Sequence, residues 1–408
     1  MLAGAGIQAG VSSTGPMIAG RIVSGLGMGF INSTCPVILA EAAPSATRGR
    51  FLAAQLSCLN FGIFLAYWVG FGFSYVSGSV AWRVPIALQC AFIVPIGLLT
   101  LIVPESSRWL AAHGKEEESL RSISRLMGRD ISDIAVRQQY EEIMGTVELE
   151  QAIGTGSWKA LFKDDDLQNR KRFLIACGIQ IMQQLGGING IIYYSGTLLL
   201  TTGLSNYGAS LVSGILFTWF FLASFIPWFL IDSVGRRRLL LVCISLMAAC
   251  FAAEAGLIWK VESGNGKAAG IGAVAVLFVY MGLFTTGFQA VVWVYPSEIL
   301  SLKYRQKGSS ISTACNWIIN YMIVQITPIA LVSIHYKYYI IFAVINASFV
   351  PIIYMFFPET KGLTLEAVDA IFSRSGIAPA GTHAEPSLSY PDGDLKAEAD
   401  HVDFETTK

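Results

Sequence analysis

The sequence predicts an all-α membrane protein built from two similar helical bundles, and three observations lead to this prediction. Hydrophobic residues make up 53% of the 408-residue chain and charged residues only 14%, whereas an ordinary globular protein has about 25% charged residues. The charges are clustered, so uncharged stretches of about 20 residues remain, the length that a helix needs to cross a bilayer. A cassette of charged residues also occurs twice, with about 255 residues between the copies.

The cassette joins a glutamate and an arginine seven residues later to a Pro-Glu pair that follows a long apolar stretch. Its two copies are Glu41, Arg48, Gly49, Pro104 and Glu105, and Glu298, Arg305, Gly308, Pro358 and Glu359. An internal duplication in a very apolar chain is typical of transporters whose two halves are structural repeats.

Ten segments are expected to be membrane helices. They cover residues 1–14 (a short first piece), 18–42, 51–75, 83–103, 173–200, 208–231, 239–259, 270–296, 309–333 and 337–357. Proline or glycine interrupts several of them, which membrane helices tolerate where neighbouring groups satisfy the freed backbone. The interruptions are Pro36, Pro95, Gly186-Gly187, Pro227, Pro328 and Pro351.

These spans divide the chain into two bundles, a connecting loop and a tail. The first bundle, residues 1–103, has about four helices and the second, residues 173–357, has six. When the two cassettes are aligned, the second bundle has two helices more than the first. We therefore expect the chain to be truncated at its N-terminus.

The loop and the tail differ from the bundles in composition. The loop, residues 104–172, contains two amphipathic segments, from Lys115 to Met127 and from Val136 to Leu149. The tail, residues 358–408, is rich in Pro, Gly, Ser, Asp and Glu from about residue 374, so we expect disorder there.

The lysines and arginines of the short loops predict the orientation. Eight lie on one side, namely Arg48, Arg50, Arg236, Arg237, Arg238, Lys303, Arg305 and Lys307. Four lie on the other, namely Arg83, Lys260, Lys267 and Lys337. Since cytosolic loops carry the excess of positive charge, the first side is expected in the cytosol, together with the loop 104–172 and the tail.

Several classes of function find no support in the sequence. The chain has 28 basic and 28 acidic residues, so nothing favours binding to nucleic acid. Its seven cysteines lack metal-ligand spacing, and no hydrolase triad or phosphate-binding loop occurs. We therefore expect no enzyme activity, catalytic residue, metal or cofactor. Ionisable groups are almost absent from the spans; Glu254 is expected to lie near an outer helix end and to reach water there.

Six motifs follow one another between residues 1 and 372. They are Gly20-Arg21 with Gly25, Gly27 and Gly29; Pro36 with Glu41 and Arg48-Gly49; Pro104 to Leu110; Gln183 to Asn189 with Tyr193-Tyr194-Ser195; Asp232 with Gly235-Arg236-Arg237; and Pro358 to Gly362. Together they resemble the sugar porter family of the major facilitator superfamily, especially the hexose and polyol transporters of fungi.

The resemblance implies a fold and a function. The fold is that of the major facilitator superfamily, two pseudo-symmetric six-helix bundles, with about ten of the twelve helices present in this chain. The function is transport of a sugar or polyol by alternating access, as a uniporter or a proton symporter. The resemblance also implies a monomer in the plasma membrane. Its partners would be the sugar or polyol, the surrounding lipid bilayer and, in the case of a symporter, protons. A sugar sensor that does not transport, and an inactive truncated transporter, remain alternatives.

The expected substrate site consists of amide side chains and a tryptophan. Gln183, Gln184 and Asn189 lie beside the Gly186-Gly187 break, and an amide offers both a donor and an acceptor to a sugar hydroxyl. The resemblance adds Trp293, Asn316 and Asn320. The alternative is that the amides hold membrane helices together and that Trp293 is a packing residue.

The chain departs from the family pattern at several positions. Ile38 stands where tyrosine is usual, Leu56 where a sugar-binding glutamine is expected, and Phe220 where an asparagine is expected. Residues 289–292, Gln-Ala-Val-Val, replace Gly-Pro-x-Pro. Because a site built for a hydroxyl discriminates strongly when its partner is missing, we expect a substrate that is less hydroxylated than glucose or shaped differently.

The resemblance also implies a gate at the cytosolic helix ends, where ion pairs would link the two bundles while the gate is shut. Its members are Glu41, Arg48, Glu105, Arg108, Asp232, Arg236, Arg237, Glu298, Arg305 and Glu359. The alternative is that these charges only set the topology at the membrane interface and need no pairing.

Overall fold

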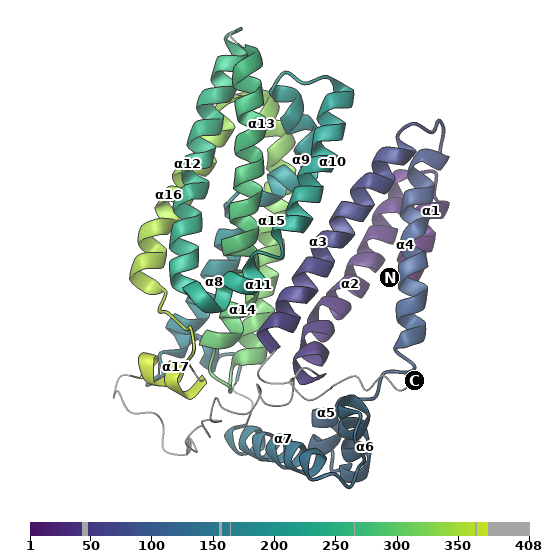
Figure 1. Cartoon of the computed structure of the whole chain (residues 1–408), viewed down its shortest axis with the longest axis vertical. Coiled ribbons are helices and arrows are strands. Elements are labelled where there is room, and N and C mark those ends of the chain that lie inside the picture. Colours follow the sequence, from purple (N-terminus) through teal and green to yellow (C-terminus); the bar gives the residue numbers. More distant parts are fainter. Residues whose placement is uncertain (43–47, 155–156, 164, 265, 364, 374–408) are drawn as a thin grey trace, which may run out of the picture.

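The computed structural model describes residues 1–42, 48–154, 157–163, 165–264, 266–363 and 365–373. Within these ranges the secondary structure is entirely helical, without a β strand. The tail that we expect to be disordered, from about residue 374, lies outside the described residues. The helices form two groups that stand side by side, with a set of short helices at one end (Figure 1).

The first group contains four helices. They are α1 (Leu2–Gly10), α2 (Thr14–Ala42), α3 (Arg48–Phe73) and α4 (Val80–Leu99). The short α1 packs against both α2 and α4. It is held there by Gln8, a buried amide whose Nε2 donates to the Gly20 carbonyl oxygen at 3.2 Å and to Ser24 Oγ at 2.7 Å.

The second group is larger. It consists of α8 (Asn169–Leu185), α9 (Ile188–Thr201), α10 (Asn206–Ala223), α11 (Pro227–Val234), α12 (Arg236–Glu262), α13 (Gly266–Leu283), the π-helix η2 (Phe284–Gln289), α14 (Ala290–Ile299), α15 (Arg305–Ile334) and α16 (Lys337–Phe356). All ten expected spans therefore fall on helices.

Of the six expected interruptions, two divide a span and four, including Pro36 inside α2, do not. Gly186-Gly187 separates α8 from α9, and Pro227 begins α11. Pro95, Pro328 and Pro351 lie inside α4, α15 and α16, which continue through them. A proline removes one backbone donor, and in a membrane bundle neighbouring groups can compensate for that loss.

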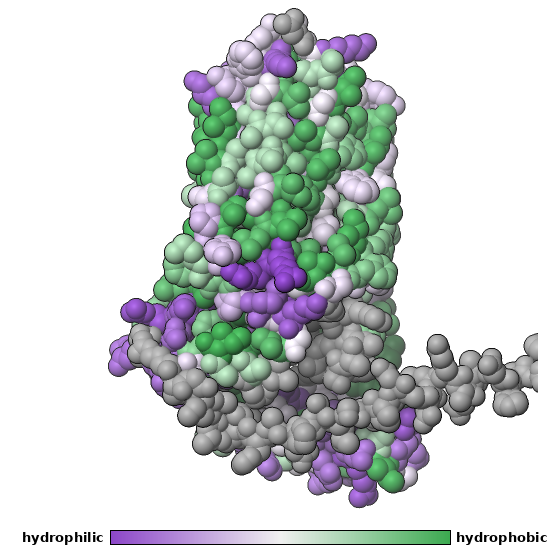
Figure 2. Space-filling model, turned by 60° about the vertical axis from the view of Figure 1, so that its left-hand side comes forward, coloured by the Kyte–Doolittle hydropathy of each residue, from purple (hydrophilic) through white to green (hydrophobic). Residues whose placement is uncertain are grey.

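Seven helices in the described part are long and apolar enough to cross a membrane. These candidates are residues 54–73, 80–99, 206–231, 236–262, 266–299, 305–334 and 337–356. Figure 2 shows a broad hydrophobic band along the side of the helices, with hydrophilic residues gathered toward both ends. This distribution is the one expected for a surface that faces lipid between two aqueous phases.

Within the described residues, five further helices lie outside the expected membrane spans. They are α5 (Ser107–Ala112), α6 (Glu116–Met127), α7 (Ile134–Ile153), η1 (Ala160–Phe162) and α17 (Leu365–Phe372). α6 and α7 overlap the two amphipathic segments expected in the loop. α5 was not expected from the sequence; it begins at Ser107, and the side chain of its N-cap residue, Ser106, accepts a hydrogen bond from the Trp109 amide.

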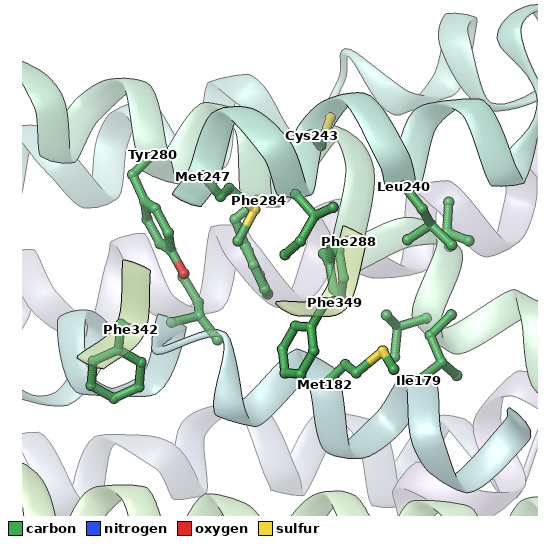
Figure 3. Packing of buried hydrophobic residues seen from close by; sticks show 14 of the residues in the cluster. Ile179, Met182, Leu240, Cys243, Met247, Tyr280, Phe284, Phe288, Phe342 and Phe349 are labelled. Carbon is green, nitrogen blue, oxygen red and sulfur yellow. The ribbon is translucent and has the colours of Figure 1, made fainter. Parts of the chain in front are cut away.

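The second group has a continuous hydrophobic core between α8, α12, η2 and α16. Figure 3 shows part of it: Ile179 and Met182 from α8, Leu240, Cys243 and Met247 from α12, Phe284 and Phe288 from η2, and Phe342 and Phe349 from α16. Lipid tails are as apolar as these side chains. The cluster therefore stabilises the bundle mainly through close packing rather than through transfer from water.

Glu254 contradicts its prediction. It lies on α12 eight residues before the helix end, and its side chain is fully buried. Neither carboxylate oxygen has a hydrogen-bond partner. The expectation that it reaches water is wrong, because α12 is packed along its length by α13 and α16.

The two groups meet where α3 packs against α10. Tyr67 Oη donates to the Ser210 carbonyl oxygen at 2.9 Å, and Trp68 Nε1 donates to Thr218 Oγ1 at 3.1 Å. The approach depends on Gly214, since a Cβ atom there would lie 2.9 Å from the Trp68 ring. Polar and aromatic side chains thus join the groups over several turns of α3.

Candidate functional site

The break between α8 and α9 positions several amide side chains. Gln180, Gln183 and Gln184 lie within four residues on α8, so they share one face of the helix. Gly187 then takes φ +92°, which a residue with a side chain rarely adopts. A Cβ atom at Gly187 would also lie 2.7 Å from the Phe342 ring. The helix therefore turns at this glycine before it restarts toward Asn189.

Asn316 on α15 connects the three glutamines. Its Nδ2 donates to Gln180 Oε1 and to Gln183 Oε1, both at 2.7 Å. Its Oδ1 accepts a hydrogen bond from Gln184 Nε2 at 2.8 Å. All four side chains are buried, so α8 and α15 are joined by a set of hydrogen bonds shielded from water.

Asn189 extends this set across the break. Its Nδ2 donates to Gln184 Oε1 and, at 2.8 Å, to Asn320 Oδ1 on α15. We call the six connected side chains the amide cluster: Gln180, Gln183, Gln184, Asn189, Asn316 and Asn320. The structure brings together the five amides expected at the substrate site. It adds Gln180, which the sequence analysis missed although its spacing of three and four from the next glutamines places it on their face.

The cluster can do one of two things chemically. Asn189 and Asn316 use both of their N–H groups within the cluster, so a ligand hydroxyl would bind there by replacing one of these bonds. Gln184 uses one of its two N–H groups, so it can donate a further bond. The same bonds also hold α8, α9 and α15 together, which is the alternative stated for these residues. The described residues contain no group of three or more His, Cys, Asp and Glu side chains that could hold a metal.

Trp293 directly follows Val292, a residue that the amide cluster contacts. Gln180 Nε2 donates to the carbonyl oxygen of Val292 at 3.2 Å, which fixes α14 against α8. Trp293 follows directly on α14 and is half-buried. The expected tryptophan is thus one residue from the point where the cluster touches α14.

The departures from the family pattern leave apolar surfaces near α3 and α10. Leu56 lines a cavity of about 10 Å³ together with Ser224, Pro227, Thr285, Gln289 and Ala290. Phe220 is buried, with its ring 6.5 Å from that of Phe284. Neither position supplies a polar contact, as expected from the sequence.

A second pair of amides joins the two helix groups beside that cavity. Asn60 Nδ2 donates to Gln289 Oε1 at 2.9 Å, and Gln289 Nε2 donates to Asn60 Oδ1 at 2.7 Å. Asn60 on α3 is fully buried and Gln289 on η2 nearly so. The sequence analysis identified Gln289 only as a departure and missed Asn60, because nothing in the local sequence indicates a partner 229 residues away.

Part of the expected gate forms an ordered cluster at the end of the molecule that carries α17. Arg236 on α12 pairs with Glu298 on α14 at 3.1 Å, and Thr360 Oγ1 donates to Glu298 at 2.6 Å. Glu359 accepts hydrogen bonds from the backbone amides of Arg236, at 2.8 Å, and Arg237, at 3.1 Å. A carboxylate at this place complements the positive N-terminal end of the α12 dipole.

Contacts are also described for Arg237, Arg305 and Glu105 among the other gate residues. Arg237 donates to the Tyr354 carbonyl oxygen at 2.6 Å, and Arg305 Nε donates to that of Leu300 at 3.4 Å. Glu105 accepts from the amide of Ser106 at 3.2 Å, next to Arg108 at the start of α5. The side chains of Glu41, Arg48 and Asp232 lie outside the described residues. The contacts that are described for Arg236, Glu298 and Glu359 stay within the second group, so a link between the groups stays a prediction.

A further ion pair was not anticipated. The fully buried side chain of Arg172 on α8 pairs with Asp369 on α17 and donates to the carbonyl oxygen of Ile299 at 3.3 Å. Its guanidinium carbon lies 4.5 Å from the centre of the Phe372 ring. α17 is therefore anchored to the same end of the second group as the Arg236–Glu298 pair.

One family model and several known proteins match this chain over most of its length. A family model described as "Sugar (and other) transporter" matches residues 1–372. The chain is 36% identical over 376 residues to the MFS-type transporter oryC of Aspergillus oryzae, covering 91% of this chain and 70% of that protein. It is 34% identical over 373 residues to the Sugar transporter STL1 of Saccharomyces cerevisiae, covering 90% of this chain and 64% of that protein.

A solved structure has a similar fold. It is that of the proton:xylose symporter XylE, a protein of Escherichia coli, bound to 6-bromo-6-deoxy-D-glucose. The TM-score is 0.73 with 24% sequence identity, over 91% of this chain and 81% of that chain. At this identity the likeness establishes the arrangement of the helices.

Proposed function

The chain belongs to the sugar transporter family of the major facilitator superfamily, and from this premise we propose that it carries an uncharged sugar or polyol across a membrane by alternating access. The membership confirms the predicted all-α membrane fold and the resemblance to sugar porters. It also identifies the chain as a multi-pass membrane protein related to transporters rather than to enzymes.

The amide cluster is the observation that carries the proposal. Five amide side chains of α8 and α15 are buried, and Asn189 extends them past the break between α8 and α9. Transporter sites tend to form at such helix breaks near the bilayer midplane. Amides offer donors and acceptors without charge, which suits a hydroxylated, uncharged ligand. The relatives include proteins named Sugar transporter STL1 and Low-affinity glucose transporter HXT4, which supports a sugar or polyol as the substrate class.

We assign roles to the residues as follows. The amide cluster and Trp293 bind the substrate. The gate residues stabilise one state of the transporter, with Arg236, Glu298 and Glu359 at its core. The two helix groups, residues 1–103 and 173–357, rock around the site. Both uniport and proton symport fit this scheme. The proton:xylose symporter XylE has a similar fold.

The orientation and location are part of the proposal. The end that carries α5, α6, α7 and α17 faces the cytosol, because the loops at that end hold the excess of lysine and arginine. We propose the plasma membrane as the location, a monomer as the active form and the bilayer lipids as its surroundings.

Uptake into vesicles tests the function. The 408-residue chain is reconstituted in liposomes, and uptake of labelled D-glucose, D-xylose, D-sorbitol and glycerol is measured with and without a pH gradient. We expect uptake of at least one compound and its abolition by Gln184→Ala or Asn189→Ala, with insertion unchanged. Gln139→Leu, which removes an exposed amide on α7, is the matched control. Normal uptake by both site variants would contradict the site assignment, and binding without uptake would indicate a sensor.

A further inference from the structure

We propose that Asn60 and Gln289 form a second hydroxyl-binding subsite, which takes the vicinal diol of the sugar or polyol. The inference rests on the proposed function and deepens it, because it adds a contribution from the first helix group to a site otherwise built by the second. Four observations lead to it. Asn60 lies on the face of α3 that meets the second group, and Gln289 lies three residues before Val292, which the amide cluster contacts. The pair can exchange its hydrogen bonds for bonds to hydroxyl groups, and the other residues that line the adjacent cavity are uncharged.

Asn60 occupies the face of α3 that the expected glutamine would have used. It follows Leu56 by four residues, so the two side chains share a helix face and Asn60 lies about 6 Å farther along the axis. Leu56 and Gln289 line the same cavity. The amide that the sequence lacks at Leu56 is therefore present one turn later, on the surface that meets the second group.

Gln289 lies close to the amide cluster. It is the last residue of η2 and precedes Val292 by three residues, and Val292 accepts a hydrogen bond from Gln180 of the cluster. One helical turn thus separates the pair from the cluster. π-helical turns inside α-helices are frequent at functional sites. The cluster therefore contacts, through the Val292 carbonyl oxygen, the same continuous helical segment that carries Gln289.

The two hydrogen bonds between Asn60 and Gln289 can be replaced by hydrogen bonds to a vicinal diol. In the closed pair each amide uses one N–H group and its oxygen, so a second N–H group and a lone pair remain on each side chain. A vicinal diol presents two O–H donors and two acceptor oxygens. When it replaces the amide–amide bonds, every buried polar atom keeps a partner. Opening the pair breaks both amide–amide bonds, and a bound diol replaces them.

The cavity beside Asn60 and Gln289 favours an uncharged ligand, and it is too small for a sugar unless the helices around it separate. The other residues that line the cavity are Leu56, Ser224, Pro227, Thr285 and Ala290, none of which is charged. The cavity of about 10 Å³ has room for a single water molecule. A sugar therefore reaches the pair only when α3 separates from η2, and the two helices belong to the groups that move against each other in alternating access.

Direct ligand contact explains the pair better than helix packing alone. α3 is already held to the second group by Tyr67, Trp68 and Ser57, whose Oγ donates to the Ser224 carbonyl oxygen at 3.1 Å. Among the described residues, Asn60–Gln289 is the one amide–amide contact between the groups. These contacts form the interface without the amide pair, so its atoms are available to exchange partners with a ligand.

The test is a series of deoxy sugars. Binding to the purified chain is followed by tryptophan fluorescence, for the compound of the uptake panel that binds tightest and for its monodeoxy analogues. We expect at least one analogue to bind the unaltered protein at least 10-fold more weakly than the parent. The double variant Asn60→Leu/Gln289→Leu, which replaces both amides by apolar groups, should bind the parent at least 10-fold more weakly and lose the discrimination against that analogue. The exchange Asn60→Gln/Gln289→Asn should keep the discrimination.

The outcomes separate this inference from the proposed function. If Gln184→Ala abolishes binding while the double leucine variant keeps the affinities of the unaltered protein for the whole series, the pair is only a packing contact and the inference is wrong. If the unaltered protein binds no compound of the panel, the proposed function fails and the inference with it. Thermal unfolding of each variant, with Gln139→Leu as the reference, shows that a lost affinity is not a lost fold. Where the double leucine variant does not fold, the single variant Gln289→Leu is measured in its place, and unchanged affinities for the whole series would overturn the inference.

Discussion

Arg172 and Asp369 form a buried ion pair that fastens α17 to the start of α8. The Arg172 side chain is fully buried and that of Asp369 about a quarter exposed. Arg172 Nη2 also donates to the Asp369 carbonyl oxygen at 3.2 Å, and Gln168 Nε2 donates to that of Phe372 at 2.9 Å. α17 is therefore held by charge and by backbone contacts at the end of the molecule where the Arg236–Glu298 pair lies.

The first prediction concerns this pair. Asp369→Ala leaves a buried guanidinium without its counter-charge, and breaking a buried pair in this way costs about 3–5 kcal/mol. We expect that loss in the free energy of unfolding, measured by chemical denaturation in detergent. Glu117→Ala is the matched control, because its pair with Arg121 is exposed (77% and 63%) and such pairs contribute about 0–1 kcal/mol. Equal effects of the two substitutions would contradict the prediction.

The second prediction concerns the helix break at the amide cluster. Gly187→Ala introduces a Cβ atom 2.7 Å from the Phe342 ring at a φ of +92°. We therefore expect the free energy of unfolding to fall by at least about 1–2 kcal/mol. We also expect uptake to decrease, because the break positions Asn189. Gly178→Ala on α8 is the control, since a Cβ there meets no atom within 4 Å. Alanine is the better helix former, so this variant should be neutral or slightly more stable. Unchanged stability of Gly187→Ala would show that the break is not constrained as described.

The third prediction concerns Glu254. Its carboxylate oxygens are buried without hydrogen-bond partners, and burial of an unsatisfied polar group costs about 1–3 kcal/mol on the scale of protein mutations. Glu254→Leu should therefore raise the free energy of unfolding by about that amount. The measurement is denaturant unfolding in detergent, with Glu254→Gln as the variant that keeps shape and polarity. A less stable leucine variant would mean that the carboxyl group has a partner that the structure does not describe.

The sequence predicted the helices well because their signal is local. Apolar runs of membrane length and their charged ends lie in consecutive residues, so the ten expected spans all fall on helices. Gln184 and Asn189 were recognised for the same reason, since their motif is a short continuous segment. The short helix α5 was missed because its cap at Ser106 resembles any other serine in a polar loop.

Partners that are distant in the chain could not be predicted. Asn60 and Gln289 are separated by 229 residues, and Arg172 and Asp369 by 197. Which buried polar groups meet depends on how whole helices pack, and hydropathy does not encode that. For the same reason Glu254 was placed near water, although α13 and α16 cover it.

The last prediction concerns the cap of α12. Glu359 accepts hydrogen bonds from the first two backbone amides of this helix, and its removal by Glu359→Ala should cost about 1–2 kcal/mol of unfolding free energy. Gly235 precedes these amides with φ +99°, and a Cβ atom there would lie 2.7 Å from Glu359 Oε2. Gly235→Ala should therefore displace the carboxylate as well as strain the backbone.

Because both substitutions remove the same cap, their effects should not add. The double variant Gly235→Ala/Glu359→Ala should be more stable than the sum of the single losses predicts, by about 0.5–1 kcal/mol, since the cap can be lost only once. Glu116→Ala, in the first turn of the exposed helix α6, is the control for removing a carboxylate near a helix start and should change stability by less than about 0.5 kcal/mol. Strictly additive losses at Gly235 and Glu359 would mean that the carboxylate stays on the α12 amides despite the added methyl group.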